Sequence, residues 1–113
     1  MSQIEALVIN CLNSELDVPA YAEVPEDPPD SYVVIEKTGG STTNHIRYAE
    51  IAVDSYAPSL YEASVLDEEV SDAMDMLTFE DEVSGVEFVS SHNHTNKTTK
   101  QPRYQSLFEI TYY

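Results

Sequence analysis

The chain has 113 residues, a formal net charge of −16 from 21 acids and five bases, and 42% hydrophobic residues. This length predicts one domain over residues 1–113 with a small core, and the charge disfavours binding to nucleic acid phosphates or anionic membranes. Cys11 is the single cysteine, so no internal disulfide forms, and no apolar run reaches the roughly 18 residues of a membrane span. The N-terminus lacks the basic start of a signal peptide, so we expect a protein that stays in the cytosol or joins something assembled there.

The first predicted element is a helix that starts at residue 2. Ser2 and Glu5 have the spacing of a capping box, and an apolar stripe with three- and four-residue steps follows. The stripe consists of Ile4, Leu7, Val8, Cys11 and Leu12. We expect the helix to end near Asp17, because Pro19 disfavours helical geometry at the residue before it.

A short edge strand at 20–24 and a proline-rich acidic segment come next. Pro25, Pro28 and Pro29 lack backbone donors and favour extended geometry, so this segment is expected to run over the surface into a strand at 31–38. Gly39 and Gly40 are expected to end that strand, with GGSTTN (39–44) as a flexible turn. A second strand from His45 to about Tyr56 completes a hairpin.

The second half of the chain predicts a helix and two more strands. Pro58 and a second capping box, Ser59 with Glu62, precede a helix with an apolar face and an acidic outer face. The apolar face comprises Ala63, Leu66, Val70, Ala73, Met74 and Leu77; the outer face comprises Asp67, Glu68, Glu69, Asp72 and Asp75. GVEFVSS (85–91) predicts a strand, 92–102 a polar loop, and RYQSLFEITYY (103–113) a closing strand with Tyr104, Phe108, Ile110 and Tyr112 on one face.

These elements together predict an α+β fold. We expect a mostly antiparallel four-stranded sheet, extended by the short edge strand, with both helices packed on one face.

Residues capable of catalysis are present but do not form a site in the sequence. His92, Asn93 and His94 are adjacent in a loop, whereas a nuclease would take such residues from separate positions around one metal ion. Cys11 lies on an apolar stripe, where a packed thiol is expected, and TGGSTTN has no lysine placed as in a phosphate-binding loop. We therefore predict no enzyme activity, no catalytic residue, and no cofactor or metal.

Four segments in order resemble a known family. They are PAYAEVP (19–25), YVVIEKTGG (32–40), AEIAVDSYAPSLYEAS (49–64) and the terminal RYQSLFEITYY. The chain resembles the tail-terminator or tail-completion proteins of long-tailed bacteriophages, also called minor capsid or neck proteins. The resemblance implies a hexameric ring in the virion that caps the tail tube, stops its growth, binds the head connector and lets DNA pass through its lumen. It also implies assembly in the bacterial cytoplasm.

Charge is distributed unevenly along the chain. Residues 91–108 contain no acid, and the part at 91–103, here called the basic arm, contains Lys97, Lys100 and Arg103. In a ring, one face of a subunit meets a different face of the next, so opposite charges at different places suit assembly. We therefore expect the basic arm to contact an acidic surface of a neighbouring subunit. Two surfaces are candidates: an acidic ledge at 23–30 with Glu23, Glu26, Asp27 and Asp30, and the outer face of the second helix with Asp67 and Asp72.

Two alternatives belong to other classes of protein. A small acidic protein that mimics DNA and inhibits a nucleic-acid-binding protein would have a similar size and charge, but it would not assemble with itself. An enzyme would need a pocket with convergent polar groups.

Overall fold

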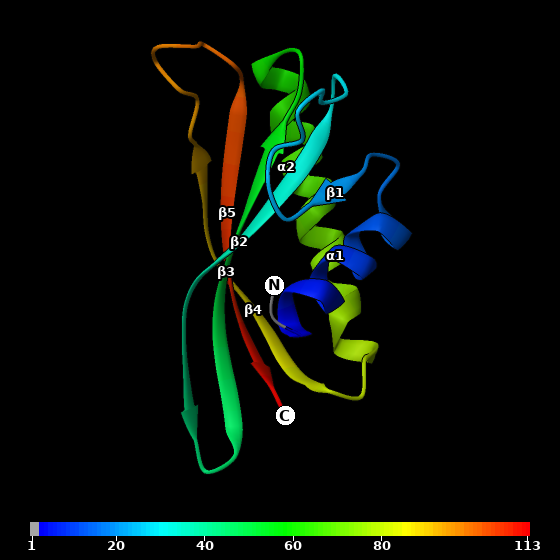
Figure 1. The fold of residues 1–113 in the computed structure, drawn as a ribbon, viewed down its shortest axis with the longest axis vertical. Coiled ribbons are helices and arrows are strands. Elements are labelled where there is room, and N and C mark those ends of the chain that lie inside the picture. Colours follow the sequence, from blue (N-terminus) through cyan, green and yellow to red (C-terminus); the bar gives the residue numbers. More distant parts are fainter. Residues whose placement is uncertain (1–2) are drawn as a thin grey trace.

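The computed structural model describes residues 3–113, which form a twisted sheet covered on one face by two helices (Figure 1). The sheet has five strands in the order β1-β2-β3-β5-β4; β1 and β2 are parallel, and all other neighbours are antiparallel. This arrangement confirms the predicted α+β fold and its short edge strand. In chain order the elements are α1 (Gln3–Glu15), β1 (Ala20–Tyr21), β2 (Tyr32–Thr43), β3 (Ile46–Tyr56), α2 (Leu60–Asp75), the 3-10 helix η1 (Met76–Phe79), β4 (Val83–Asn93) and β5 (Arg103–Tyr112).

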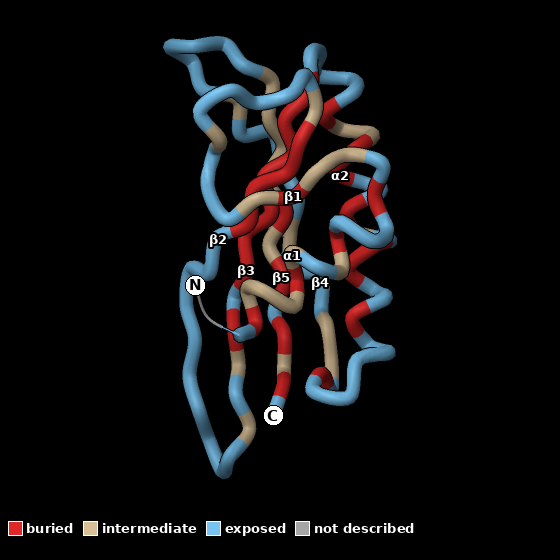
Figure 2. The backbone as a smooth tube through the Cα atoms, turned by 45° about the vertical axis from the view of Figure 1, so that its right-hand side comes forward, coloured by how far each residue is buried: buried red, intermediate tan, exposed pale blue. Residues whose placement is uncertain are grey.

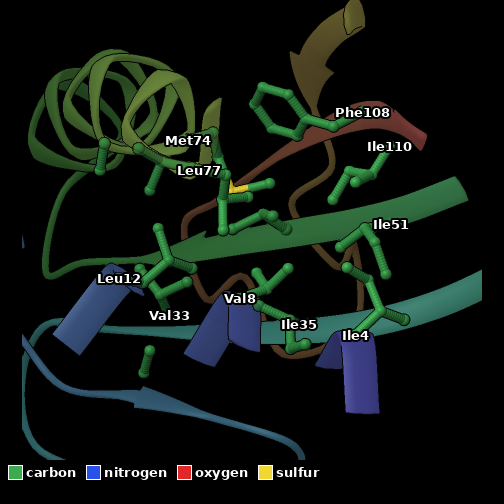
Figure 3. Close-up of a cluster of buried hydrophobic side chains, with 14 of the residues drawn as sticks. Ile4, Val8, Leu12, Val33, Ile35, Ile51, Met74, Leu77, Phe108 and Ile110 are labelled. Carbon is green, nitrogen blue, oxygen red and sulfur yellow. The ribbon is translucent and has the colours of Figure 1, made fainter. Parts of the chain in front are cut away.

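The core lies between the helices and one face of the sheet. Apolar residues at four-residue steps on α1 are buried against alternate residues of the strands, as the two periodicities require. Figure 3 shows this layer, in which the labelled residues are Ile4, Val8, Leu12, Val33, Ile35, Ile51, Met74, Leu77, Phe108 and Ile110. The predicted stripes of both helices are confirmed, with Leu7 and Cys11 partly buried at the margin.

The start of α2 shows the predicted cap. Ser59 has extended backbone geometry, and its hydroxyl accepts a hydrogen bond from the Glu62 N–H at 3.1 Å and donates to the Glu62 carboxylate at 3.0 Å. The first of these bonds satisfies a backbone N–H of the first turn that the helix leaves unpaired, and the second holds the Glu62 side chain against the cap. The capping box predicted for Ser2 and Glu5 lies partly outside the described residues.

The prediction that Gly39 and Gly40 end a strand is wrong. Both lie inside β2, directly after a register shift that begins at Lys37. The turn is instead formed by Asn44 and His45, whose φ angles of 52° and 68° are those a tight hairpin turn requires. Gly40 allows a close backbone approach, since a Cβ there would make a tight contact of 3.0 Å with the Tyr48 carbonyl oxygen.

The β2–β3 hairpin extends beyond the helices. Residues 36–45 are exposed throughout, and the hairpin forms the lower end of a molecule with extents of 44 × 25 × 24 Å (Figures 1 and 2). In this distal hairpin, residues 37–48, most residues are exposed, whereas residues 32–35 of β2 and 51–56 of β3 are all buried.

The last two strands form a second long hairpin. The predicted strand at 85–91 is confirmed, but β4 runs from Val83 to Asn93 and includes the start of the predicted polar loop. Three of the four residues predicted on one face of β5 are buried, and Tyr104 is half-buried.

Candidate functional site

The basic arm is the end of the β4–β5 hairpin. Its tip is held by Asn96, whose side-chain oxygen accepts from the N–H groups of Thr98 and Thr99 at 2.8 and 3.2 Å. Lys97 and Lys100 are both exposed on this turn, and the Lys100 N–H donates to the Asn96 carbonyl at 2.8 Å. The arm therefore presents two lysines on a defined turn.

Arg103 differs from the two lysines because its guanidinium is engaged within the chain. It lies over the Tyr56 ring, 5.6 Å from the centroid, and donates to the Tyr56 hydroxyl at 3.0 Å and to the His94 carbonyl at 3.0 Å. Tyr56 is stacked on Tyr32 with centroids 4.6 Å apart. Arg103 thus anchors the base of the arm to the sheet.

The acidic ledge connects β1 to β2. Glu23, Glu26, Asp27 and Asp30 are all exposed, as predicted, while Pro25 is half-buried. The segment is fixed at both ends, because the Val33 N–H donates to the Pro19 carbonyl at 3.0 Å and Tyr21 packs edge-on against Tyr32. The ledge is therefore an exposed acidic loop between two anchored strands.

The arm and the ledge lie at the same end of the molecule, where the Gln101 amide of the arm donates to the Tyr32 hydroxyl, just after the ledge, at 3.2 Å. In Figure 1 the arm extends to the upper left and the ledge lies to the right of β5. This placement follows from the sheet order, since the arm joins the strands at one edge and the ledge joins those at the other. One chain therefore carries both oppositely charged surfaces at one end of the molecule.

The prediction that Asp67 lies on the outer face of the second helix is wrong. Asp67 is only 7% exposed, and its two carboxylate oxygens accept hydrogen bonds from the hydroxyls of Ser91 and Ser106. It lies four positions after Ala63 and three before Val70, both buried, so the helical period places it on the buried face of α2. Asp72, in contrast, is exposed as predicted.

Asp54 is a buried carboxyl that the sequence analysis did not identify. It is 8% exposed, on the sheet face opposite the helices, where it accepts from the Gln105 amide at 3.0 Å. Burial raises the pKa of Asp54, although Gln105, Arg103 and His94 partly offset the rise. In the sequence, its burial could have been inferred from its position among the small and apolar residues of β3.

Substituting Asp54 with asparagine is expected to raise the melting temperature at pH 7. The folded-state pKa is above the unfolded one, so the protonated carboxyl favours the fold and this contribution is lost as pH rises through the folded pKa. Asparagine keeps the oxygen that accepts from Gln105 and never ionises. Asp72→Asn, at an exposed position, is the control for removing one negative charge. A gain for Asp54→Asn over this control at pH 7 that disappears at about pH 3 would confirm the prediction; an equal gain at both pH values would contradict it.

The other reactive side chains do not converge. Cys11 donates to the Ala73 carbonyl at 3.5 Å, and burial, with the charges of Glu15 and Glu80, raises the pKa of its thiol. The rings of His92 and His94 have centroids 5.6 Å apart, but residues 3–113 contain no group of three His, Cys, Asp or Glu side chains placed to hold a metal ion. None of the described helices is long and apolar enough to cross a membrane.

A cleft lies beside the distal hairpin. It has a volume of about 590 Å³ and is bounded by the start of α1, residues 37–42 of β2, Arg47, Tyr48 and Tyr112. Lys37 and Arg47, the two bases outside the arm, both line it. The cleft is therefore a cationic feature at the end of the molecule opposite the arm.

The sequence matches no protein-family model and no curated protein. Its fold, however, is similar to that of a chain from the virion of a native gene transfer agent particle. The two superpose with a TM-score of 0.58 at 11% identity, over 95% of this chain and 84% of the other. This fold thus occurs in a component of a virion particle.

Proposed function

We propose that this protein is a structural component of a phage or phage-like virion, and that it acts as a tail terminator. In this role it forms a ring on the end of the tail tube, stops polymerisation of the tube and binds the head connector. The observation that carries the proposal is the shared fold with a gene transfer agent virion chain over 95% of the sequence. The earlier resemblance of four sequence segments to tail terminators supports the finer role.

The charge arrangement supports a ring of identical subunits. A ring forms when one surface of a subunit repeatedly binds a different surface of the next and the rotation closes. The arm and the ledge provide such a pair, with exposed lysines on the arm and exposed carboxylates on the ledge. We propose the hexamer that the family resemblance implies, in which DNA traverses the lumen; the net charge of −16 would keep DNA from binding to the wall.

Removing the gene from the phage or prophage that encodes it tests the role in tails. We expect particles with tubes of uncontrolled length that are not joined to heads, and restoration by the wild-type gene supplied in trans. Tubes of normal length joined to heads in the deletion strain would contradict a terminator.

Negative-stain electron microscopy of the purified protein tests the ring directly. Uniform rings with a central hole, formed alone at high concentration or on the end of the tube, are expected. If the protein forms no ring even when the tube is present, and binds a basic host protein tightly in low salt, the DNA-mimic alternative would be favoured instead.

A further inference from the structure

A second pair of oppositely charged segments lies at the lower end of the molecule. The distal hairpin has Lys37 and Arg47 and no acid between residues 37 and 49. The turn into β4 consists of Glu80, Asp81 and Glu82, all exposed. In Figure 1 the hairpin lies at the lower left and this acidic turn at the lower right. In this view the cationic segment is on the same side as the basic arm, and the acidic turn is on the other side.

Both segments adjoin strand edges that have no partner among residues 3–113. β1 pairs with β2 only at Val33 and Val34, so the outer edge of β2 is unpaired from Ile35 to Thr43. β4 is the last strand of the sheet, and no described strand pairs with its outer edge. A free strand edge presents unpaired N–H and C=O groups that bind another strand.

The β4 edge has register shifts between Val83 and Gly85 and between Phe88 and Ser90, but it has few of the other features that protect an exposed strand. Val83–Asn93 contains no lysine, arginine or proline, and Phe88 and Val89 are 51% and 49% exposed. Beside Gly85 there is open space, since a Cβ there would meet nothing within 4 Å. The β2 edge carries Lys37 and a register shift between Lys37 and Gly39, and residues 37–42 border the 590 Å³ cleft. Such edges are typical of surfaces that become covered on assembly.

We propose that the outer edge of β2, residues 36–43, binds the first half of β4, residues 83–88, in a second copy of this chain as antiparallel strands. This inference rests on the proposed ring, in which all subunits point the same way along one axis. In that orientation β2 runs toward the lower end and β4 runs away from it, so the two strands meet antiparallel (Figure 1). The same contact brings Lys37 and Arg47 toward the acidic turn of the neighbour, while the arm meets the ledge at the upper end.

Hydrogen–deuterium exchange measured on the assembled and the dilute protein tests the strand pairing. The amides of 36–43 and 83–88 are expected to exchange at least tenfold more slowly after assembly, because main-chain pairing protects them. Peptides from the start of α2, where Tyr61 is 77% exposed, serve as the control and are expected to stay unchanged. Assembled protein in which either edge exchanges as in the monomer would overturn the pairing.

Charge substitutions test the same contact independently. Lys37→Glu with Arg47→Glu is expected to raise the concentration needed for assembly at least tenfold, and adding Glu80→Lys with Glu82→Lys to the same chain is expected to reverse that loss. Normal assembly of the first variant would overturn the proposal. Open-ended assemblies in which the amides of both strand edges are protected from exchange would support the strand pairing and contradict a closed ring. A protein that stays monomeric and never binds the tube would contradict both the pairing and the ring.

Discussion

Replacing Lys97 and Lys100 together with glutamate is expected to abolish ring assembly at micromolar concentration in low salt. Both side chains are exposed on a turn defined by Asn96, so the substitutions leave the fold intact. An exposed ion pair contributes only ~0–1 kcal/mol, but reversing two charges replaces attraction by repulsion at every interface of the ring. A loss of about 2 kcal/mol per interface weakens each contact roughly thirtyfold.

The ledge offers the matched control for this variant. Glu26→Lys with Asp27→Lys in the same chain would exchange the charges of the two surfaces and restore the attraction between copies. Sedimentation velocity at increasing protein concentration measures assembly in all three proteins, and circular dichroism checks the fold. Rings formed by the double glutamate variant at wild-type concentration would refute the contact between arm and ledge. The contact would also be refuted if the exchanged variant kept the wild-type melting temperature but still did not assemble.

Salt provides a second check on the same contact. Screening shortens the range of exposed charges to about 8 Å at physiological ionic strength, so the difference between wild type and variant should shrink as salt is added. Arg103 is expected to behave differently, because it binds Tyr56 and the His94 carbonyl within its own chain. Its substitution would lower the melting temperature, whereas substitution of the two lysines would not.

The parts of this fold that the sequence predicts are those with a strong local signal. The stripe on α1, the capped start of α2 and the alternation in β5 each repeat at the period of one secondary structure, so they identify the element and its buried face together. The acidic ledge was also predictable, because three prolines and four acids within 23–30 suit an exposed loop.

The errors arose where tertiary structure overrides a local signal. Gly39 and Gly40 suggested a turn, yet Gly40 allows a close backbone approach inside β2, and the turn falls on Asn44 and His45. Asp67 suggested a solvated helix face, since its acidic neighbours do lie outside. Its actual partners, Ser91 and Ser106, are 24 and 39 residues away, and no local pattern could connect them.

The placement of arm and ledge at the same end of the molecule was likewise not predictable. Both segments were identified as charged, but their positions depend on the strand order β1-β2-β3-β5-β4, which places β5 between β3 and β4. The same order leaves β4 at an open edge. Local periodicity does not determine strand order, so the two charged segments could be named by residue but not located from sequence alone.

Asp67→Ala is expected to lower the free energy of unfolding by about 2–4 kcal/mol, because it leaves two hydroxyls without their acceptor and removes hydrogen bonds to a charged group. Ser106 is fully buried, so water cannot replace the lost carboxylate there. Urea unfolding followed by circular dichroism measures the change. Asp72→Ala on the same helix is the control, since Asp72 is exposed and its loss removes the same charge. A difference between the two variants of less than about 0.5 kcal/mol, the usual range of surface substitutions, would contradict a structural role for Asp67.

Asp67→Asn separates the loss of an acceptor from the loss of a charge. Asparagine keeps one carbonyl oxygen for one of the two serines, so the expected loss of stability is smaller than for alanine. Because Ser91 lies where β4 enters the basic arm, the carboxylate of Asp67 also connects α2 to the base of the arm. The Asp67→Ala variant is therefore expected to assemble less because fewer of its molecules are folded. Its assembly is expected to recover at low temperature, where most molecules are folded. The arm-lysine variant would not recover under those conditions, since its defect lies in the contact itself.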